Sequence, residues 1–283
     1  MSTIILGHSG FVGKHIYDNL KKNKINPIGG NTKNCNLLKK TQTEKFFKGK
    51  NKFNLIICSS LVRSKKDNQK SFNQNILMIS NLLNVIDEKN VNKIIFLSSI
   101  DTYKPTKSKL KENTSPTIPE TKYGLYKLTA EYLLKNKFPS KKLIILRLTG
   151  VYDDNINGIN MVSYIRRGIK KSFLDINSSG KELRDYIHAE DVAHVVHFFL
   201  LNNFSGIYNV ASKPISKFEL LHLINDNFDL GLIINDDKTV ISNKTLNASK
   251  IEKEIGLQTP SWDELIFELK KDYMNFIDLY KTV

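Results

Sequence analysis

The sequence predicts an α/β fold in which a doubly wound parallel sheet is followed by a small C-terminal lobe. In the first 150 residues, short apolar runs alternate with longer segments whose apolar residues recur at helical spacing. The run at 54–58 is apolar on both faces, which is typical of a strand buried in a parallel sheet. Strands that alternate with helices form β-α-β units, and such units build parallel sheets covered by helices. The length of 283 residues fits about two domains, or one large α/β domain with an attached lobe.

Local patterns justify the elements of the first half in order. A short apolar run ending in glycine opens the chain, and the next segment places Val12, Ile16 and Leu20 on one helical face. The polar, proline-bearing stretch 104–119 is expected to be a loop. The expected strands are 2–6, 25–28, 54–58, 93–97 and 142–148, and the expected helices are 11–22, 41–47, 71–88 and 121–137.

The alternation weakens after about Val151. We expect residues 1–150 to form one domain, and residues 151–283 to complete the sheet and add the small lobe, interleaved with the first part. A ligand of such a chain binds between the parts, at the C-terminal ends of the strands. The expected elements of the second half are helices at 160–171, 188–202, 216–227 and 261–281, with short strands near 183–187 and 206–210.

Composition excludes several classes of protein. Apolar residues make up 40% and charged residues 25% of the chain, which fits a folded globule and excludes a mainly disordered one. No stretch approaches the roughly 18 uninterrupted apolar residues of a membrane span, and no cationic segment precedes the first apolar run as in a secretory signal. Two cysteines, Cys35 and Cys58, cannot build a disulfide framework, and no Cys/His spacing indicates a metal site. We therefore expect a cytoplasmic protein with no membrane partner and no metal.

The chain is strongly basic. Lys and Arg number 43 against 28 Asp and Glu, which gives a formal net charge of +15. Such a balance fits nucleic acid, an anionic membrane surface or anionic small substrates. The excess is scattered lysine without a dense basic block, so we interpret it as compositional bias and expect no nucleic-acid partner.

A glycine-rich turn follows the first expected strand. Gly7, Gly10 and Gly13 have the spacing Gly-x-x-Gly-x-x-Gly and lead into the first expected helix. Glycine lets the backbone turn tightly and approach a pyrophosphate, and the helix N-terminus offers free N–H groups and a partial positive charge. With a strand before it and a helix after it, the pattern predicts a dinucleotide site in a Rossmann-type sheet. Phe11 and Val12 belong to this expected site.

The end of the second expected strand favours NADP(H) over NAD(H) by a small margin. A carboxylate about 20 residues after the glycines would bind the adenosine ribose of NAD, but the sequence there is Gly29-Gly30-Asn31-Thr32-Lys33. Asn31 can hydrogen-bond a hydroxyl group, and Lys33 can pair with a 2′-phosphate. The alternative is that Lys33 is one more surface lysine among many.

Tyr123 and Lys127 begin an expected helix at a spacing of four residues, so their side chains share one face. A phenol titrates near 10, and a lysine cation beside it favours the phenolate, which makes the tyrosine a usable acid or base. Ser99 follows the expected strand 93–97 and lies 24 residues before Tyr123. Serine can donate to a substrate carbonyl while tyrosine moves the proton. A glycine turn, a strand-end serine and Tyr-x-x-x-Lys rarely occur in this order by accident.

With these motifs, the sequence resembles the extended short-chain dehydrogenase/reductases, specifically the NAD(P)-dependent nucleotide-sugar epimerases, dehydratases and 4-ketoreductases. The resemblance covers nearly the whole chain, and its most specific segment is RDYIHAEDVA, which begins at Arg184. The other matching landmarks are GHSGFVG at 7–13, Asn75, Ser99, Tyr123, Lys127, LRLTGVY at 146–152, GIYNVASKPIS at 206–216 and LNASKIEKEIG at 246–256.

The resemblance implies a role for each matched residue. Tyr123, Lys127 and Ser99 would form the catalytic set, with Lys127 also holding the nicotinamide ribose, and Asn75 would contact the cofactor. Arg184 would contact the pyrophosphate of a nucleotide-diphosphate sugar. A homodimer is also implied. The implied substrate-binding residues are Ser99, Asp101, Tyr123 and Arg184.

Departures from the family pattern narrow the expected reaction. Gly150 stands where an asparagine often holds the substrate phosphates, and Asp153 replaces a glycine. The 4,6-dehydratases carry an Asp-Glu pair directly after the catalytic hydroxyl residue, whereas Ser99 is followed by Ile100 and Asp101. One carboxylate of the pair is missing, which argues against water elimination.

We therefore expect a reductase of a nucleotide-linked 4-keto-6-deoxyhexose, with hydride delivered to C4 and the proton supplied by Tyr123. The closest alternative is a nucleotide-sugar 4-epimerase that retains NAD. A more distant alternative is a non-catalytic relative that senses dinucleotide or binds RNA.

Overall fold

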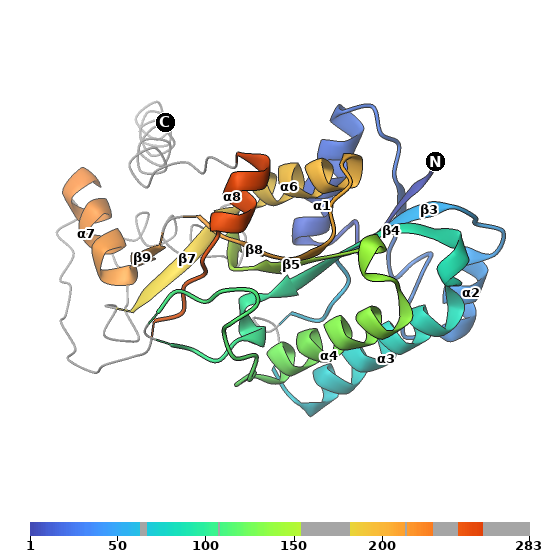
Figure 1. Ribbon diagram of the computed structural model, residues 1–283, viewed down its shortest axis with the longest axis horizontal. Coiled ribbons are helices and arrows are strands. Elements are labelled where there is room, and N and C mark those ends of the chain that lie inside the picture. The colour runs from blue at the N-terminus through green and yellow to red at the C-terminus, as the bar shows by residue number, and fades with distance from the viewer. Residues whose placement is uncertain (63–66, 107, 154–181, 213, 229–242, 257–283) are drawn as a thin grey trace, which may run out of the picture.

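A six-stranded parallel sheet forms the centre of the computed structural model (Figure 1). The structure describes residues 1–62, 67–106, 108–153, 182–212, 214–228 and 243–256. In spatial order the strands are β2 (Ile28–Gly30), β1 (Thr3–Leu6), β3 (Phe53–Ile57), β4 (Val91–Ser99), β5 (Leu143–Leu148) and β8 (Gly206–Val210). The predicted doubly wound parallel sheet is confirmed.

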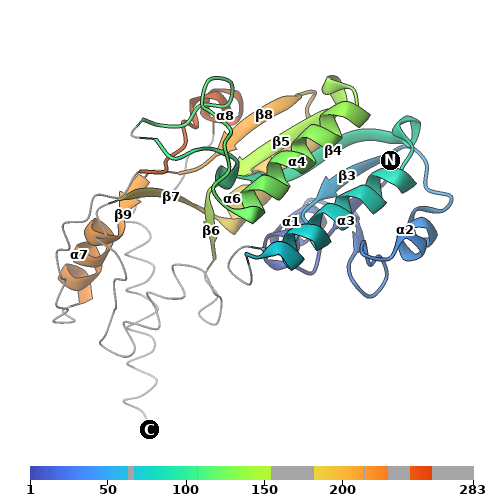
Figure 2. The ribbon, with the colours of Figure 1, turned by 90° about the horizontal axis from the view of Figure 1, so that it is seen from below.

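Helices cover both faces of this sheet (Figures 1 and 2). On one face lie α2 (Lys40–Phe47), α3 (Gln69–Val85) and α4 (Lys122–Lys137), and on the other lie α1 (Phe11–Lys22), α6 (Ala189–Leu201) and α8 (Ser249–Ile255). Among the described helices, none combines the length and hydropathy needed to cross a bilayer. In the described ranges, three 3₁₀ turns join the elements: Glu88–Asn90, Ile100–Thr102 and Ser140–Lys142.

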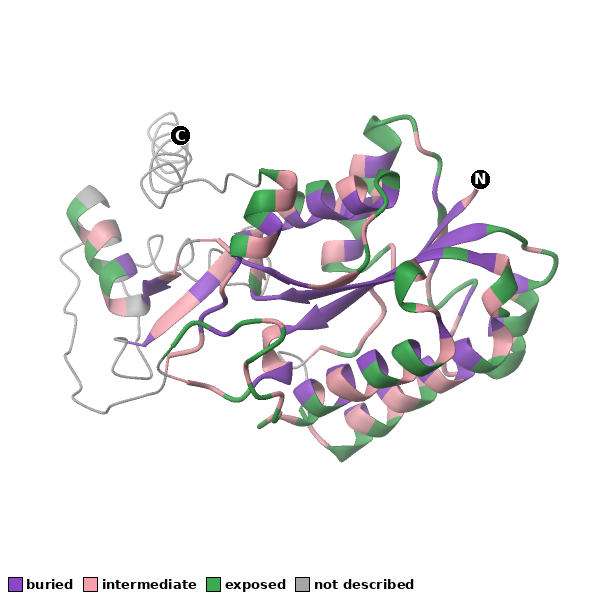
Figure 3. Cartoon of the chain, in the orientation of Figure 1, coloured by how far each residue is buried: buried purple, intermediate pink, exposed green. Residues whose placement is uncertain are grey.

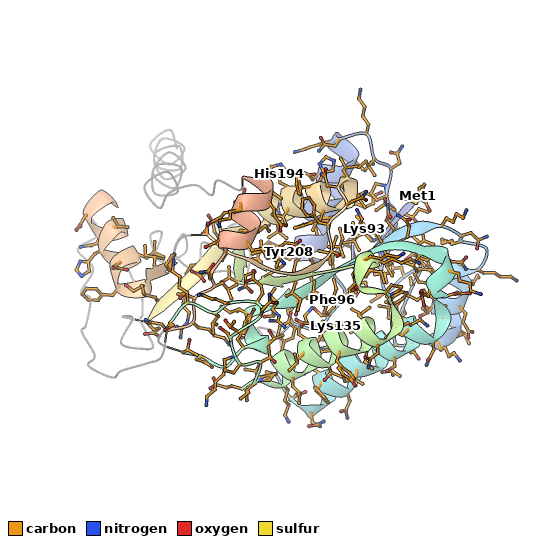
Figure 4. All side chains as sticks on the ribbon, in the orientation of Figure 1. Met1, Lys93, Phe96, Lys135, His194 and Tyr208 are labelled. Carbon is orange, nitrogen blue, oxygen red and sulfur yellow. The ribbon has the colours of Figure 1, made fainter. Side chains whose placement is uncertain are left out.

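The strands are buried because both of their faces meet apolar layers. Successive side chains of a strand point to opposite faces, so Ile94 and Phe96 pack with α3 and α4 while Ile95 packs with α1 and α6. Figure 3 shows the strands buried between helices whose outer faces are exposed. Figure 4 labels two side chains of β4, with Phe96 near the centre of the sheet and Lys93 towards α6.

A smaller sheet lies at one end of the molecule, at the left of Figure 1. It consists of β6 (Gly150–Tyr152), β7 (Leu183–His188) and β9 (Pro214–Ser216), with β6 parallel and β9 antiparallel to β7. The helix α7 (Lys217–Phe228) follows β9 directly. Residues of this sheet and of segment 243–248 face the C-terminal ends of the central strands and form the far wall of a cleft.

The order of the strands places a crevice at the end of β1. From β1 the chain passes to β2 on one side and then to β3 on the other. At such a reversal, the connections leave the strand ends in opposite directions and open a space for ligand. The Gly7 amide donates to the Gly30 carbonyl at 2.7 Å, and the Cys58 amide donates to the Leu6 carbonyl at 2.9 Å, so the three strand ends are in register there.

Several predicted boundaries were wrong. The second strand was expected at 25–28 but spans Ile28–Gly30, because the Ile25 amide completes the end of α1 by donating to the Leu20 carbonyl at 2.9 Å, and Pro27 cannot donate to a strand neighbour. The helix expected at 71–88 is α3, which begins earlier because Asn68 caps it and ends before the extended Ile86. The strands β6 and β9 and the helix α8 were not predicted. The helices expected at 160–171 and 261–281 lie outside the described residues.

Candidate active site

The glycine turn between β1 and α1 has the shape that a dinucleotide pyrophosphate requires. Gly7 has a φ of +82°, and a Cβ on Gly13 would lie 2.1 Å from the Gly7 carbonyl oxygen, so side chains are excluded at both positions. Gly10 is the N-cap residue of α1 and has no side chain to accept hydrogen bonds from the first N–H groups of the helix. The first turn also carries no acidic residue. The free N–H groups and positive end of α1 are therefore available to an anion. These features fit the predicted cofactor.

A cleft of about 1840 Å³ opens in front of this turn. It is bounded on one side by the ends of the central strands and on the other by β7 and the segment that contains Lys244. The structure brings most of the predicted site residues together here. Those that line the cleft are Gly7, Gly10, Phe11, Val12, Gly13, Ser99, Asp101, Tyr123, Lys127 and Arg184.

Tyr123 and Lys127 enter the cleft from the first turns of α4. Thr121 caps this helix by accepting from the Gly124 amide at 2.9 Å, and the Tyr123 amide donates to the Asp67 side chain at 2.9 Å. Lys127 is 2% exposed, and its Nζ donates to the Leu97 carbonyl at 2.6 Å. The same Nζ lies 5.4 Å from the centre of the Tyr123 ring, so the pair shares one face as predicted.

Burial controls the charge of both side chains. It lowers the pKa of the Lys127 ammonium to about 7, while the thiol of Cys58 and the carboxylate of Glu131 act to raise that pKa. For Tyr123, burial raises the pKa above its usual value, and a hydrogen bond to Ser60 opposes the change. The sequence predicted a lowered pKa for Tyr123, but burial has the larger effect here and keeps the phenol protonated. A protonated phenol can serve as a proton donor.

Ser99 lies at the end of β4, opposite the start of α4. It is 9% exposed, and its Oγ accepts from the Asp101 amide at 3.1 Å. Gly124 permits this approach, because a Cβ there would lie 2.1 Å from the Asp101 carbonyl oxygen. Sequence reasoning missed Gly124, although a glycine inside the first turn of a helix is a visible signal of close packing.

An ion pair connects Asp101 with the far wall of the cleft. Lys244 Nζ lies 2.8 Å from Asp101 Oδ1, and both side chains are 13% exposed. The backbone of Lys244 pairs with that of Arg184 in β7 as an isolated parallel β-bridge, and Arg184 Nη1 donates to the Leu183 carbonyl at 2.9 Å. Arg184 and Lys244 therefore place two cations on this wall of the cleft. Lys244 was not among the predicted residues.

Asn75 lies beneath the loop that follows β3. It is 1% exposed, its Oδ1 accepts from the Leu61 amide at 2.8 Å, and its Nδ2 donates to the Leu61 carbonyl at 3.0 Å. Leu61 and Val62 line the cleft, whereas Asn75 is not among the described lining residues. The contacts show a residue that holds the loop, and its binding role stays a prediction.

The two residues chosen for the adenosine end lie after β2. The Asn31 Oδ1 accepts from the Lys33 amide at 2.9 Å, which closes a tight turn. The Lys33 side chain is exposed. Neither is among the described residues that line the cleft, and their roles in cofactor preference also stay predictions.

The residues that depart from the family pattern have partners of their own. A Cβ on Gly150 would lie 2.9 Å from Cδ1 of Tyr186, its register partner in β7, so the Tyr186 ring takes the space of a longer side chain. Asp153 Oδ2 lies 3.3 Å from Nε2 of His15 in α1. Cys58 lines the cleft, and burial raises the pKa of its thiol to about 12.

Comparison with known proteins agrees with this site. The profile of the NAD dependent epimerase/dehydratase family matches residues 3–211. The chain belongs to this family. That membership confirms the resemblance seen in the sequence, and with it an enzyme of the NAD(P)-dependent epimerase/reductase group.

Individual proteins show how broad the likeness is. The chain is 28% identical over 227 residues to GDP-L-colitose synthase of Yersinia pseudotuberculosis, with 72% of this chain and 73% of that protein covered. The UDP-glucose 4-epimerase of Thermus thermophilus, solved with NAD, superposes with a TM-score of 0.74 at 20% identity, covering 92% and 94% of the two chains. The dTDP-4-dehydrorhamnose reductase of Bacillus anthracis, solved with NADP, gives 0.76 at 18% identity over 97% and 98%. These structural similarities establish the shared fold.

Proposed function

We propose that this protein is an NAD(P)-dependent reductase of a nucleotide-linked 4-keto-6-deoxyhexose. The observation that carries the proposal is the meeting of Ser99, Tyr123 and Lys127 in one cleft with the glycine turn. A half-buried phenol, a buried ammonium and a strand-end hydroxyl in that arrangement can deliver a proton to a carbonyl oxygen. The glycine turn supplies the place for the redox cofactor.

Each residue has a distinct task in this proposal. The turn at Gly7–Gly13 and the α1 N-terminus bind the pyrophosphate of the dinucleotide, which supplies the hydride when bound. Lys127 holds the nicotinamide ribose. Tyr123 donates its proton to the sugar oxygen at C4, and Ser99 hydrogen-bonds that oxygen as negative charge develops on it.

The substrate half of the cleft fits an anionic ligand. Arg184 lines it from β7, and its planar guanidinium can bind a diphosphate bidentately. Two similar proteins named above are a synthase of a GDP-sugar and a reductase of a dTDP-4-keto sugar. We assign a nucleotide-diphosphate sugar as substrate on these grounds. By the same resemblance, we propose a cytoplasmic homodimer.

For the cofactor we favour NADP(H) by a small margin. The proposal rests on Lys33 and on the lack of a carboxylate in the segment after β2. Proteins of this fold have been solved with NAD and with NADP. The preference therefore depends on this chain's own residues.

The 4-epimerase is the second candidate, favoured by the structural similarity to UDP-glucose 4-epimerase. An epimerase retains its NAD and returns the hydride, whereas a reductase consumes one reduced dinucleotide for each sugar. The test is purified protein incubated with a nucleotide-linked 4-keto-6-deoxyhexose and NADPH or NADH, followed by nicotinamide absorbance. Stoichiometric oxidation of the dinucleotide supports the reductase. Repeated turnover of UDP-glucose without added dinucleotide contradicts it and supports the epimerase.

A further inference from the structure

A buried ion pair lies directly behind the catalytic side chains. Glu131 of α4 has no exposed surface, and Arg147 of β5 is 2% exposed. Arg147 Nε donates to Glu131 Oε1 at 2.9 Å, and Nη2 donates to Oε2 at 2.6 Å, which is a bidentate contact. Ser98 Oγ donates to Glu131 Oε1 at 2.5 Å. The carboxylate therefore joins three elements at one buried point.

Two of those elements carry the proposed catalytic set. Glu131 follows Lys127 by one helical turn, so the two side chains share a face of α4. Ser98 immediately precedes Ser99 and is the register partner of Arg147 in the sheet. The Glu131 carboxylate thus connects the helix that bears Lys127 with the strand that ends at Ser99.

Other groups complete the surroundings of this pair. The Tyr103 ring packs on Arg147, with its centre 4.5 Å from Cζ, and the Tyr103 hydroxyl donates to Asn209 Oδ1 at 2.8 Å. Burial raises the pKa of Tyr103, so this hydroxyl stays neutral. The groups in contact with Arg147 on this side are therefore neutral, and a further charge nearby is the Glu112 carboxylate, which accepts from the Asn209 backbone amide at 2.9 Å and acts to raise the pKa of Tyr103.

The surroundings of Lys127 are equally defined. The rings of Phe96, Tyr123 and Tyr126 pack around its Nζ at 4.9, 5.4 and 5.3 Å from their centres. Cys58 faces it from the end of β3, with a thiol whose pKa burial raises to about 12. The negative charge of Asp101, in the adjoining 3₁₀ turn, acts to raise the pKa of Tyr123. A negative charge on either Cys58 or Glu131 would raise the pKa of Lys127. Because the Cys58 thiol is neutral near pH 7, Glu131 is the one of the two that carries this charge.

We propose that Glu131 and Arg147 are a positioning pair: their contacts hold Lys127 in place against Ser99, and the balance of their two charges maintains the Lys127 ammonium. The inference rests on the proposed function, because it assumes that Lys127 binds the dinucleotide. It extends that function to two residues that touch neither substrate nor cofactor. Loss of either charge should change the pH range in which Lys127 acts.

The test compares Glu131→Gln with Arg147→Met by measuring dinucleotide affinity against pH through the fluorescence of bound NADPH. Glu131→Gln removes a negative charge near Lys127, so the pH at which affinity falls should move down by about one unit or more, the scale of a neighbouring charge. Arg147→Met leaves the negative charge of Glu131 uncompensated, so the pH at which affinity falls should move up. The inference is overturned if the pH at which dinucleotide affinity falls stays the same in both variants, or moves in the same direction in both.

The control is Lys93→Met. Lys93 is another buried charge, 8% exposed, but its Nζ donates to carbonyls at the end of α6, with distances of 2.8 Å to Phe199 and 2.6 Å to Asn202. The Lys93→Met variant should destabilise the fold without changing the pH at which dinucleotide affinity falls. If that pH also shifts in this control, the shift is a general effect of destabilisation, and the specific role of Glu131 and Arg147 is overturned.

A second variant decides the matter if a single charge variant fails to fold. Ser98→Ala removes one hydrogen bond from the Glu131 carboxylate and leaves both charges in place. Turnover should fall about tenfold, with dinucleotide affinity unchanged, because the catalytic groups lose alignment. Turnover within twofold of the wild type overturns the inference. Wild-type protein that binds no dinucleotide at any pH would instead refute the proposed function, and the inference with it.

Discussion

Gly124→Ala tests how closely α4 must approach the 3₁₀ turn that follows Ser99. The new Cβ would lie 2.1 Å from the Asp101 carbonyl oxygen, about 0.9 Å short of the 3.0 Å that Cβ atoms keep from such neighbours. The nearest atoms are backbone, so no side chain can rotate away. The start of α4 must therefore move away from the turn by about that distance, and Tyr123 moves with it.

The expected effects on stability and on turnover differ in size. Alanine has a better helix propensity than glycine by about 1 kcal/mol, while overpacking costs about 1–3 kcal/mol, so the free energy of unfolding should fall by only about 0–2 kcal/mol. A misplacement of about 1 Å between catalytic groups costs about 100-fold in rate. We expect turnover to fall about 100-fold with a thermal midpoint close to that of the wild type.

The assay is the steady-state rate of dinucleotide oxidation beside a thermal melt and a dinucleotide titration. Leu125→Ala is the matched control, because it changes the neighbouring residue of the same helix on the exposed side. It should leave the rate unchanged. A Gly124→Ala variant that folds and keeps a rate within threefold of the wild type would refute the claim that this contact aligns Tyr123 with Ser99.

Three further substitutions test separate parts of the site. Lys33→Ala should weaken NADPH binding by about 1–3 kcal/mol, the worth of a charged hydrogen bond, and leave NADH binding nearly unchanged, as isothermal titration would show; equal losses would refute the NADP preference. Arg184→Lys should raise the KM for the nucleotide sugar with dinucleotide affinity intact, because lysine cannot reproduce a bidentate contact, and an unchanged KM would remove Arg184 from the substrate site. Gly13→Ala should abolish dinucleotide binding, because its Cβ would meet the Gly7 carbonyl oxygen at 2.1 Å; retained binding would place the cofactor elsewhere.

Local signals explain why much of the fold could be predicted. The helix at 11–22 has the predicted bounds, because a glycine turn fixes its start and its apolar spacing continues to Leu20. The strand β2 was misplaced because Ile25 and Ile28, on either side of Asn26 and Pro27, resemble the apolar positions of a short strand, whereas the Ile25 amide donates to the end of the preceding helix. The short strands β6 and β9 are fixed by pairing with β7 more than by their own sequence, so a local pattern did not indicate them.

In the candidate site, too, local motifs could be predicted from the sequence and long-range contacts could not. Residues that form short motifs, such as Gly7–Gly13 and Tyr123 with Lys127, could be predicted because their spacing carries the geometry. Contacts between distant segments could not. Asp101 and Lys244 are separated by 143 residues, and Glu131 and Arg147 belong to different elements, so these charges resemble solvated surface residues in the sequence.

The most direct test of the central claim is the turnover of Tyr123→Phe, measured beside its dinucleotide affinity. Phenylalanine keeps the shape of the side chain and removes the hydroxyl that would donate the proton. We expect normal folding and normal dinucleotide binding, with turnover reduced about 10²–10⁴-fold, the usual worth of a positioned acid or base. Tyr126→Phe is the control, since Tyr126 is buried on the same helix and is not among the described residues that line the cleft. If Tyr123→Phe keeps most of its activity while Tyr126→Phe loses it, the assignment of Tyr123 as the catalytic acid is contradicted.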